Sequence, residues 1–202
     1  MANANRPSGL SPVKYLNGSM WTGQATQYCI PSTDSTYAYA IGDPVDIAGG
    51  ADGNGVPTVV LATAGITNPI LGAIVATSSV PFGSANAAVL NNLNTTIIPI
   101  VKASNYYVLV TDDPNVIYEI QEVGGGTQLT AAEVGLNAPL IAGANNGYIS
   151  GWMLNNVGEV VTATEQVRLL GLAQRRDNAF GAYAKWLVLI NNHRFRIGQV
   201  GA

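Results

Sequence analysis

The chain of 202 residues carries only 10% Asp, Glu, Lys and Arg and a net charge of −3, whereas ordinary soluble domains carry about 25% charged residues. So few charged side chains argue against acid–base catalysis, and an acidic balance without a recognition motif argues against nucleic-acid binding. A surface of neutral amides and hydroxyls loses little charge hydration when it packs against a neighbour, so the composition favours a building part over an enzyme.

Residues 1–24 are predicted to form an extended arm, because prolines and glycines interrupt the segment and no apolar period is sustained. Residues 1–10 lack the apolar stretch of a signal peptide, and no later stretch reaches 18 apolar residues, so no membrane span is expected. Tyr15 and Trp21 are too apolar for a solvated tail. The arm is therefore expected to dock against this subunit or another.

From Tyr37 onward, short β-rich runs alternate with Gly, Asn, Asp and Pro clusters, a spacing typical of sandwiches and barrels. The candidate strands are Thr58–Thr63, Ile70–Ala76, Thr96–Lys102, Tyr106–Thr111, Val116–Val123, Tyr148–Leu154, Val167–Ala173 and Leu187–Ile190, the last running on past a turn to Ile197. A hairpin is expected between Tyr106–Thr111 and Val116–Glu122, because Asp112-Asp113-Pro114-Asn115 is a strong turn sequence.

One short helix is expected at Thr130–Val134, where Thr130 and Glu133 have capping-box spacing. The stretch Thr162–Gln174 also carries a capping pair, but its β-branched residues favour a strand. The predicted fold is all-β, a sandwich or jelly-roll-like barrel with an extended N-terminal arm and at most one or two short helices. The β-rich domain spans 25–202.

Turn phrases in the first part of the domain recur loosely in the second, which suggests two similar halves, about 37–123 and 124–202. Recurrent turn chemistry in an all-β protein gives the same impression, so both interpretations stay open.

Residues that commonly carry chemistry are sparse. His193 is the only histidine and cannot form a metal site alone, so it is interpreted as a structural or surface residue. Cys29 is the only cysteine, which excludes an internal disulfide and favours a cytosolic origin. The remaining candidates are the carboxylates Asp112, Asp113, Asp43, Asp46 and Asp52, which match neither a glycosidase pair nor a calcium loop. No catalytic residue, cofactor or metal is therefore expected.

The charges are unevenly placed along the chain. Residues 1–30 carry +2, residues 31–166 carry −10 with Lys102 as their single base, and residues 167–202 carry +5. The basic ends either meet an acidic surface on a neighbour or reflect a chance scatter of charges. Trp21 suits an anchor in a pocket of another subunit. The candidate interface residues are Arg6, Pro7, Lys14, Tyr15, Trp21, Arg194 and Arg196.

Several phrases resemble those of tailed-bacteriophage head proteins. The phrases are the arm Met1–Val13, the strand-and-turn phrases Ala40–Val45, Ile70–Val75 and Asn105–Pro114, and the ending from Leu170-Gly171-Leu172 through Asn178 and Lys185–Val188 to Asn191-Asn192-His193. Together they resemble head decoration, or cement, proteins. The phrases are structural turns and strands, so no binding residue is carried over from the family.

The resemblance implies a non-enzymatic, β-rich virion protein that binds the outer surface of a phage capsid and stabilises it. Its expected partners are the major capsid protein and further copies of itself, as a dimer or trimer, with neither nucleic acid nor membrane. It would be made in the bacterial host cytoplasm. The alternatives are a carbohydrate-binding or host-attachment module such as a head fibre, and a capsid shell protein. A hydrolase centred on Asp112, Asp113 or His193 would need a cleft in which these groups converge.

Overall fold

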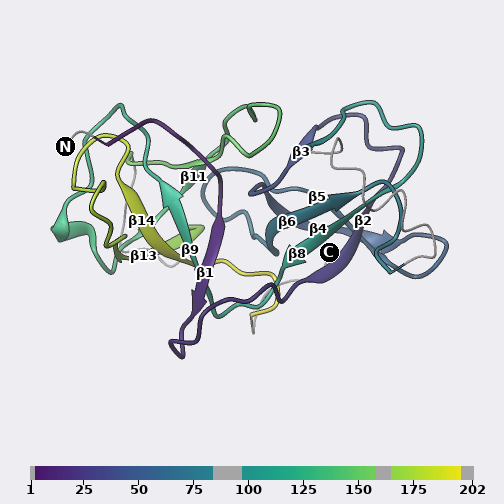
Figure 1. Ribbon diagram of the computed structural model, residues 1–202, viewed down its shortest axis with the longest axis horizontal. Coiled ribbons are helices and arrows are strands. Elements are labelled where there is room, and N and C mark those ends of the chain that lie inside the picture. The colour runs from purple at the N-terminus through teal and green to yellow at the C-terminus, as the bar shows by residue number, and fades with distance from the viewer. Residues whose placement is uncertain (1–2, 84–96, 158–164, 197–202) are drawn as a thin grey trace.

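The computed structural model describes residues 3–83, 97–157 and 165–196. These residues form β-strands and one 3-10 helix, so the predicted all-β fold is confirmed. Figure 1 shows two lobes side by side. We call the described residues 26–83 and 97–111 the barrel lobe, and the described residues 3–25, 112–157 and 165–196 the sheet lobe. Within the described ranges, no helix has the length and hydropathy that a membrane span requires.

The sheet lobe is built on an antiparallel sheet with the strand order β1-β9-β14-β13-β10. Its strands are β1 (Ser11–Tyr15), β9 (Val116–Gln121), β14 (Lys185–Ile190), β13 (Val167–Leu172) and β10 (Asn137–Ala138). Tyr118 and Ile120 of β9 enter one core cluster with Trp186 and Val188 of β14, as the two-residue period of a strand requires. The lobe also contains the two-stranded sheet of β11 (Leu140–Ile141) and β12 (Met153–Leu154), and the 3-10 helix η1 (Ala131–Glu133).

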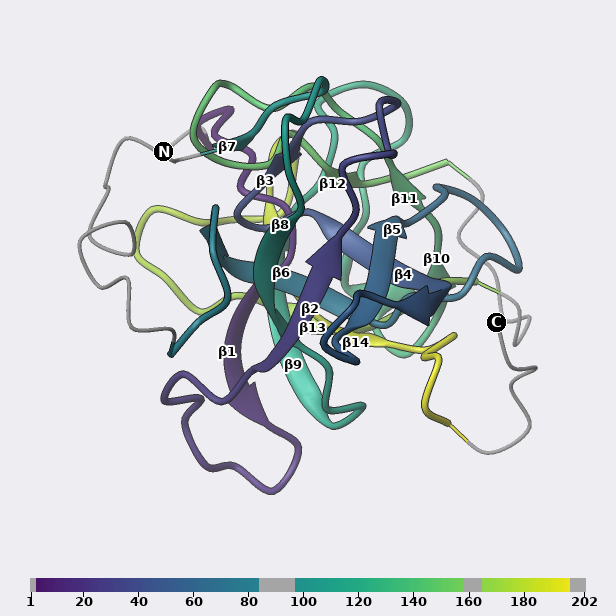
Figure 2. The same cartoon turned by 90° about the vertical axis from the view of Figure 1, so that its right-hand side faces the viewer.

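The barrel lobe is a closed barrel with the strand order β2-β5-β4-β6-β8. Its strands are β2 (Thr26–Ile30), β5 (Pro57–Leu61), β4 (Pro44–Ala51), β6 (Gly72–Ser78) and β8 (Tyr106–Thr111). The parallel pair Cys29–Thr58 closes the barrel, and its other neighbouring strands are antiparallel. A two-stranded sheet of β3 (Tyr39–Ala40) and β7 (Ile97–Ile98) lies at the upper edge of the barrel in Figure 2.

The two lobes share core and polar contacts. Ile70 and Ala73 of the barrel lobe belong to the same buried cluster as Trp186 of the sheet lobe. The fully buried Gln166 accepts hydrogen bonds at Oε1 from the backbone N–H groups of Gly65, at 3.0 Å, and of Leu140, at 3.1 Å. Its Nε2 donates to the carbonyls of Thr63 (2.9 Å) and Asn68 (3.2 Å). All four hydrogen-bonding groups of this side-chain amide are satisfied, so burial carries no penalty for an unmade bond.

The predicted hairpin is wrong, although both of its strands and its turn exist. The Asp113 side chain accepts a hydrogen bond from the Asn115 N–H at 2.8 Å, as the turn chemistry requires. However, β8 pairs with β2 and β6, whereas β9 pairs with β1 and β14. Turn residues fix a local reversal but not the strand partner, so residues 112–115 link the two lobes instead of closing a hairpin.

The expectation that residues 1–24 lack a regular element is also wrong, because β1 lies within them. Pro12 fits because β1 is the edge strand of its sheet, and the pairing with β9 shifts register between Pro12 and Lys14. The expected short helix is confirmed: η1 has the full capping box of Thr130 and Glu133. Thr96, Thr162 and Ile197, which are outer limits of three expected segments, lie outside the described residues.

Residues 3–10 run across their own sheet lobe and are fastened there by hydrogen bonds. Asn3 donates from Nδ2 to the Ala179 and Ala182 carbonyls, at 2.8 and 3.0 Å. Gln121 accepts from the Arg6 N–H at 2.6 Å and donates to the Asn5 Oδ1 at 2.9 Å. The arm therefore docks against this subunit.

Gly9 is the tightest point of the docked arm. It has φ +64°, and a Cβ atom there would lie 2.1 Å from the Gly42 oxygen and 2.6 Å from the Ser150 Cβ. We expect Gly9→Ala to lower the free energy of unfolding by about 2 kcal/mol and to speed amide exchange in residues 3–10. Gly18→Ala is the matched control, because Gly18 has φ +89° but no atom within 4 Å of its Cβ position. If urea unfolding shows equal losses of unfolding free energy for the two variants, the close approach of Gly9 to Gly42 and Ser150 is not what makes Gly9 necessary.

Candidate functional site

His193 and Cys29 are both buried. His193 is fully buried; its Nδ1 accepts a hydrogen bond from the Phe195 N–H at 3.1 Å, and its Nε2 has no partner. Burial, with a smaller contribution from Arg196, lowers the pKa of His193 to about 4. In Cys29, burial and then the charge of Asp52 raise the thiol pKa to about 11. The imidazole is therefore neutral and the thiol protonated at neutral pH, which suits packing.

The carboxylates singled out from the sequence take part in structural hydrogen bonds. Asp112 accepts from the hydroxyl groups of Tyr28 (2.7 Å) and Thr26 (3.1 Å). Asp52 caps its own turn and accepts from the Tyr107 hydroxyl at 2.8 Å. In the part of the chain that the structure describes, no group of three or more His, Cys, Asp or Glu residues is placed to hold a metal ion.

One buried carboxyl group escaped sequence reasoning. Glu122 is fully buried at the end of β9, where its Oε1 accepts from the Leu129 N–H at 2.9 Å and from Asn156 Nδ2 at 3.1 Å. Its Oε2 accepts from the Trp186 indole N–H at 2.8 Å. These donors lie 7 to 64 residues away along the chain, so no local pattern could have revealed them. The group holds the core of the sheet lobe together.

Asp43 is a second buried carboxyl group, next to the point where the arm joins the barrel. Its Oδ2 accepts from the Ala40 N–H at 2.8 Å, while the neighbouring Gly42 carbonyl accepts from the Leu10 N–H at 2.9 Å. Burial raises the pKa of Asp43 to about 6, against the lowering effect of hydrogen bonds from Ser150 and Ala40. The folded chain therefore binds this proton more tightly than the unfolded chain does. The resulting stability is complete below about pH 4 and is lost as the pH rises through about 6.

The neutral variant Asp43→Asn removes this titration. We expect its free energy of unfolding to rise relative to the wild type between pH 4 and 6, by about 2–3 kcal/mol. Urea unfolding of both proteins across this range measures the difference. His193 titrates in the opposite sense in both proteins and cancels in the comparison. A difference that does not change with pH would contradict the burial of the Asp43 charge.

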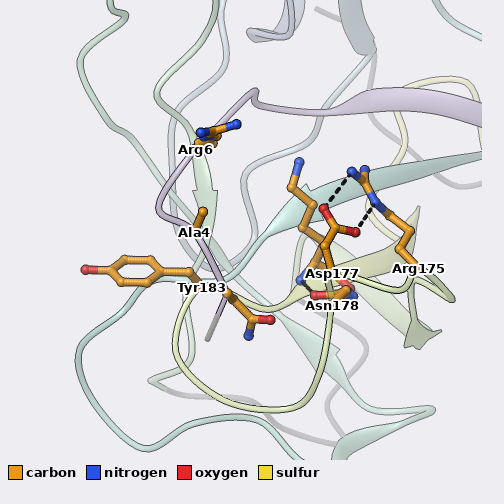
Figure 3. Close-up of a pocket in the computed structure, with 8 residues that line it drawn as sticks. Ala4, Arg6, Arg175, Asp177, Asn178 and Tyr183 are labelled. Atoms are coloured by element: carbon orange, nitrogen blue, oxygen red, sulfur yellow. Dashed lines mark hydrogen bonds and ion pairs between the residues drawn. The ribbon is translucent and has the colours of Figure 1, made fainter. Parts of the chain in front are cut away.

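Two of the candidate interface residues, Arg6 and Pro7, lie on the docked arm. Arg6 borders a polar cleft of about 100 Å³ (Figure 3), whose lining residues are Asn3, Ala4, Arg6, Arg175, Asp177, Asn178, Tyr183 and Lys185. Arg175 pairs with Asp177 at 3.1 Å and with Glu119 at 3.0 Å, and Figure 3 shows Arg6 apart from the Arg175–Asp177 pair. Arg175 is thus paired with two carboxylates, and Lys185 pairs with Glu119 at 3.3 Å.

Lys14, Tyr15 and Trp21 lie on β1 and the loop after it. The Tyr15 hydroxyl donates to Gln24 Oε1 at 3.2 Å, and the Trp21 indole donates to the Gln24 carbonyl at 3.0 Å. Trp21 also borders an apolar cleft of about 170 Å³ on its own chain. The cleft is lined by Leu10, Ser11, Pro12, Trp21, Ile41, Gly42, Ile74 and Val75. Both clefts are smaller than the roughly 300–1,000 Å³ of ordinary ligand sites.

Arg194 and Arg196 lie in the segment after β14 (Lys185–Ile190), not on the arm. Arg194 donates from Nε to Asp46 Oδ1 at 2.7 Å and pairs with the same carboxylate through its terminal nitrogen. This pair joins the segment after β14 to the barrel. Arg196 donates to the carbonyls of Asn191 (3.3 Å) and Pro114 (3.2 Å). The structure therefore places the seven candidates in several locations, some on the arm and others at the junction of the lobes.

Sequence reasoning missed three exposed apolar residues on two loops of the barrel lobe that one buried lysine joins. We call Tyr37, Ile100 and Val101 the tip; their exposed fractions are 41, 50 and 79%. The neighbouring Lys102 is buried, and its Nζ donates to the carbonyls of Asp34 (2.6 Å), Tyr37 (3.1 Å) and Ile100 (3.2 Å). One ammonium group thus holds the two loops of the tip together.

We call Lys102, Asp34 and Tyr39 the clamp, because their side chains contact one another. The Lys102 Nζ lies 3.7 Å from Asp34 Oδ2 and 5.2 Å from the centre of the Tyr39 ring, and the Tyr39 hydroxyl donates to the same carboxylate. Burial alone would raise the pKa of Asp34, but the hydrogen bonds from Tyr39 and Thr36 and the charge of Lys102 leave it below its usual value. A sequence signal existed, since Lys102 is the single base in residues 31–166.

The carboxylates Asp43, Asp52, Asp112 and Glu122 all accept hydrogen bonds from within the chain. Comparison with protein-family models, with curated proteins and with solved structures gives no significant match.

Proposed function

We propose that the protein is a non-enzymatic structural protein of a virion, which binds the outer surface of a phage capsid and stabilises it. Its partners would be the major capsid protein and further copies of itself, as a dimer or trimer. One observation carries the proposal: large apolar side chains are exposed on a surface with few charges. They are Leu16, Met20, Tyr37, Ile41, Ile66, Ile100, Val101, Val134, Ile141, Tyr148, Val157, Phe180 and Phe195.

Scattered apolar residues are normal on a monomer, but grouped ones mark interaction sites. Two places stand out: the tip, and the apolar cleft, which the exposed Ile41 and the half-buried Trp21 both line. Contacts of this kind are individually weak, yet a protein bound at many equivalent points of a shell gains strength by multivalency. The resemblance to phage head decoration proteins favours a shell as the partner.

The test is cosedimentation of the purified chain with capsids that lack it. We expect saturable binding at a fixed ratio to the shell subunit, and a higher resistance of the decorated shells to heat or pressure. A chain that stays in the supernatant at all concentrations would contradict the proposal.

A second candidate is a carbohydrate-binding or host-attachment module of the virion, such as a head fibre. Exposed Tyr148 and Tyr37 favour it, since aromatic rings can serve as sugar platforms. A glycan screen of the same purified chain distinguishes this candidate from a decoration protein. A self-assembling shell protein, the third candidate, would form closed particles without any partner.

A further inference from the structure

The charged residues are divided unequally between the two lobes. The barrel lobe holds five charged residues among its 73 described residues, whereas the sheet lobe holds 15 among its 101 described residues. This contrast is independent of the exposed apolar side chains, and it sets the two lobes apart as binding surfaces.

Four of the five charges in the barrel lobe are not available at its surface. Asp34 and Lys102 pair with each other, and Lys102 is buried. Asp46 pairs with Arg194, and Asp43 is buried with an elevated pKa. The fifth charge, Asp52, accepts hydrogen bonds from its own turn and from the Tyr107 hydroxyl. The barrel lobe therefore presents a nearly charge-free surface to solvent.

The tip projects its apolar side chains from this surface on a fastened backbone. The register of β3 and β7 pairs Tyr39 with Ile98, and Tyr37 and Ile100 each lie two residues outside this pair along the chain. The Lys102 ammonium bonds to the carbonyls of both residues. In addition, the Ser32 N–H donates a hydrogen bond to Asn105 Oδ1 at 3.0 Å. Because the tip is fixed before binding, little backbone entropy is lost when it docks.

The chemistry of the surface defines the partner. A charged partner surface would lose its hydration against the barrel lobe and find no opposite charge in return. An uncharged protein surface with an apolar hollow would lose little hydration and would gain the burial of three apolar side chains. We propose that the barrel lobe is the shell-facing end of the molecule, and that the tip inserts into an uncharged, apolar depression on the capsid protein. The sheet lobe, with its charges, then faces solvent.

This inference rests on the proposed function, and its test uses the same binding assay with matched variants. Val101→Asp places a charge on the tip, and Val157→Asp places the same charge on a valine of the sheet lobe that is 63% exposed. We expect Val101→Asp to weaken binding to capsids at least about tenfold, with Val157→Asp within twofold of the wild type. Both side chains are exposed, so both variants are expected to fold, which thermal unfolding checks.

A third variant, Arg6→Glu, tests the arm as the rival contact. A loss of binding in Arg6→Glu or Val157→Asp, with Val101→Asp unchanged, would overturn the shell-facing barrel while leaving the decoration function intact. Absence of binding by the wild type would instead overturn the proposed function, and with it the inference. A loss of capsid binding in Val101→Asp alone supports both the proposed function and the shell-facing barrel lobe.

Discussion

Replacement of Trp186 by alanine is expected to lower the free energy of unfolding by about 4 kcal/mol. The side chain is fully buried in the core of the sheet lobe, and its indole N–H donates to Glu122 at 2.8 Å. The substitution therefore removes one of the two tryptophans of that core and the hydrogen bond from its indole to a buried carboxyl group. Urea unfolding at neutral pH measures the loss.

Trp186→Phe separates the two contributions, because it keeps most of the ring volume and removes the donor. We expect a smaller loss, about 1–3 kcal/mol, the range for the removal of one partner of a buried hydrogen bond. Trp186→Ala within about 1 kcal/mol of the wild type would contradict the core described above, since deletion of a buried tryptophan ordinarily costs about 3–5 kcal/mol.

Replacement of Lys102 by methionine is expected to destabilise the protein by about 3–5 kcal/mol. The side chain of Lys102 has no exposure, and that of Asp34 is 13% exposed. Loss of the ammonium leaves three backbone carbonyls without their donor and Asp34 without its cation. Faster amide exchange in residues 31–38 and 99–105 should accompany the loss, because Lys102 joins these loops.

The double variant Lys102→Met with Asp34→Asn gives the control. If the two groups act as a pair, the double variant should be less destabilised than the sum of the single variants. Additive losses, or a Lys102→Met protein as stable as the wild type, would contradict the buried clamp.

Individual strands were predictable where apolar alternation is bounded by turn residues. The expected strand Tyr106–Thr111 coincides with β8. By contrast, β4 was missed because Asp46, Gly49 and Gly50 break its pattern, and the structure accommodates the irregularity with a register shift between Ile47 and Ala51. Strand partners were not predictable, because pairing depends on residues far away in the sequence.

The candidate binding surface was predictable only in part. The low charge content and the docked arm follow from composition and from apolar arm residues. The clamp of Lys102 joins groups up to 68 residues apart, and the pair of Arg194 with Asp46 spans 148 residues. Such contacts follow from the packed fold and leave no local pattern. Within the expected strand Thr96–Lys102, β7 ends at Ile98, and Lys102 instead turns inward to donate to carbonyls.

Cryo-electron microscopy of capsids saturated with the purified chain tests the central proposal most directly. We predict density for the chain at symmetry-related positions on the outer surface, with the barrel lobe and its tip against the shell and the sheet lobe outward. Particles without ordered density for the chain, under conditions that saturate binding in solution, would contradict a decoration role, and density with the sheet lobe against the shell would contradict the proposed orientation.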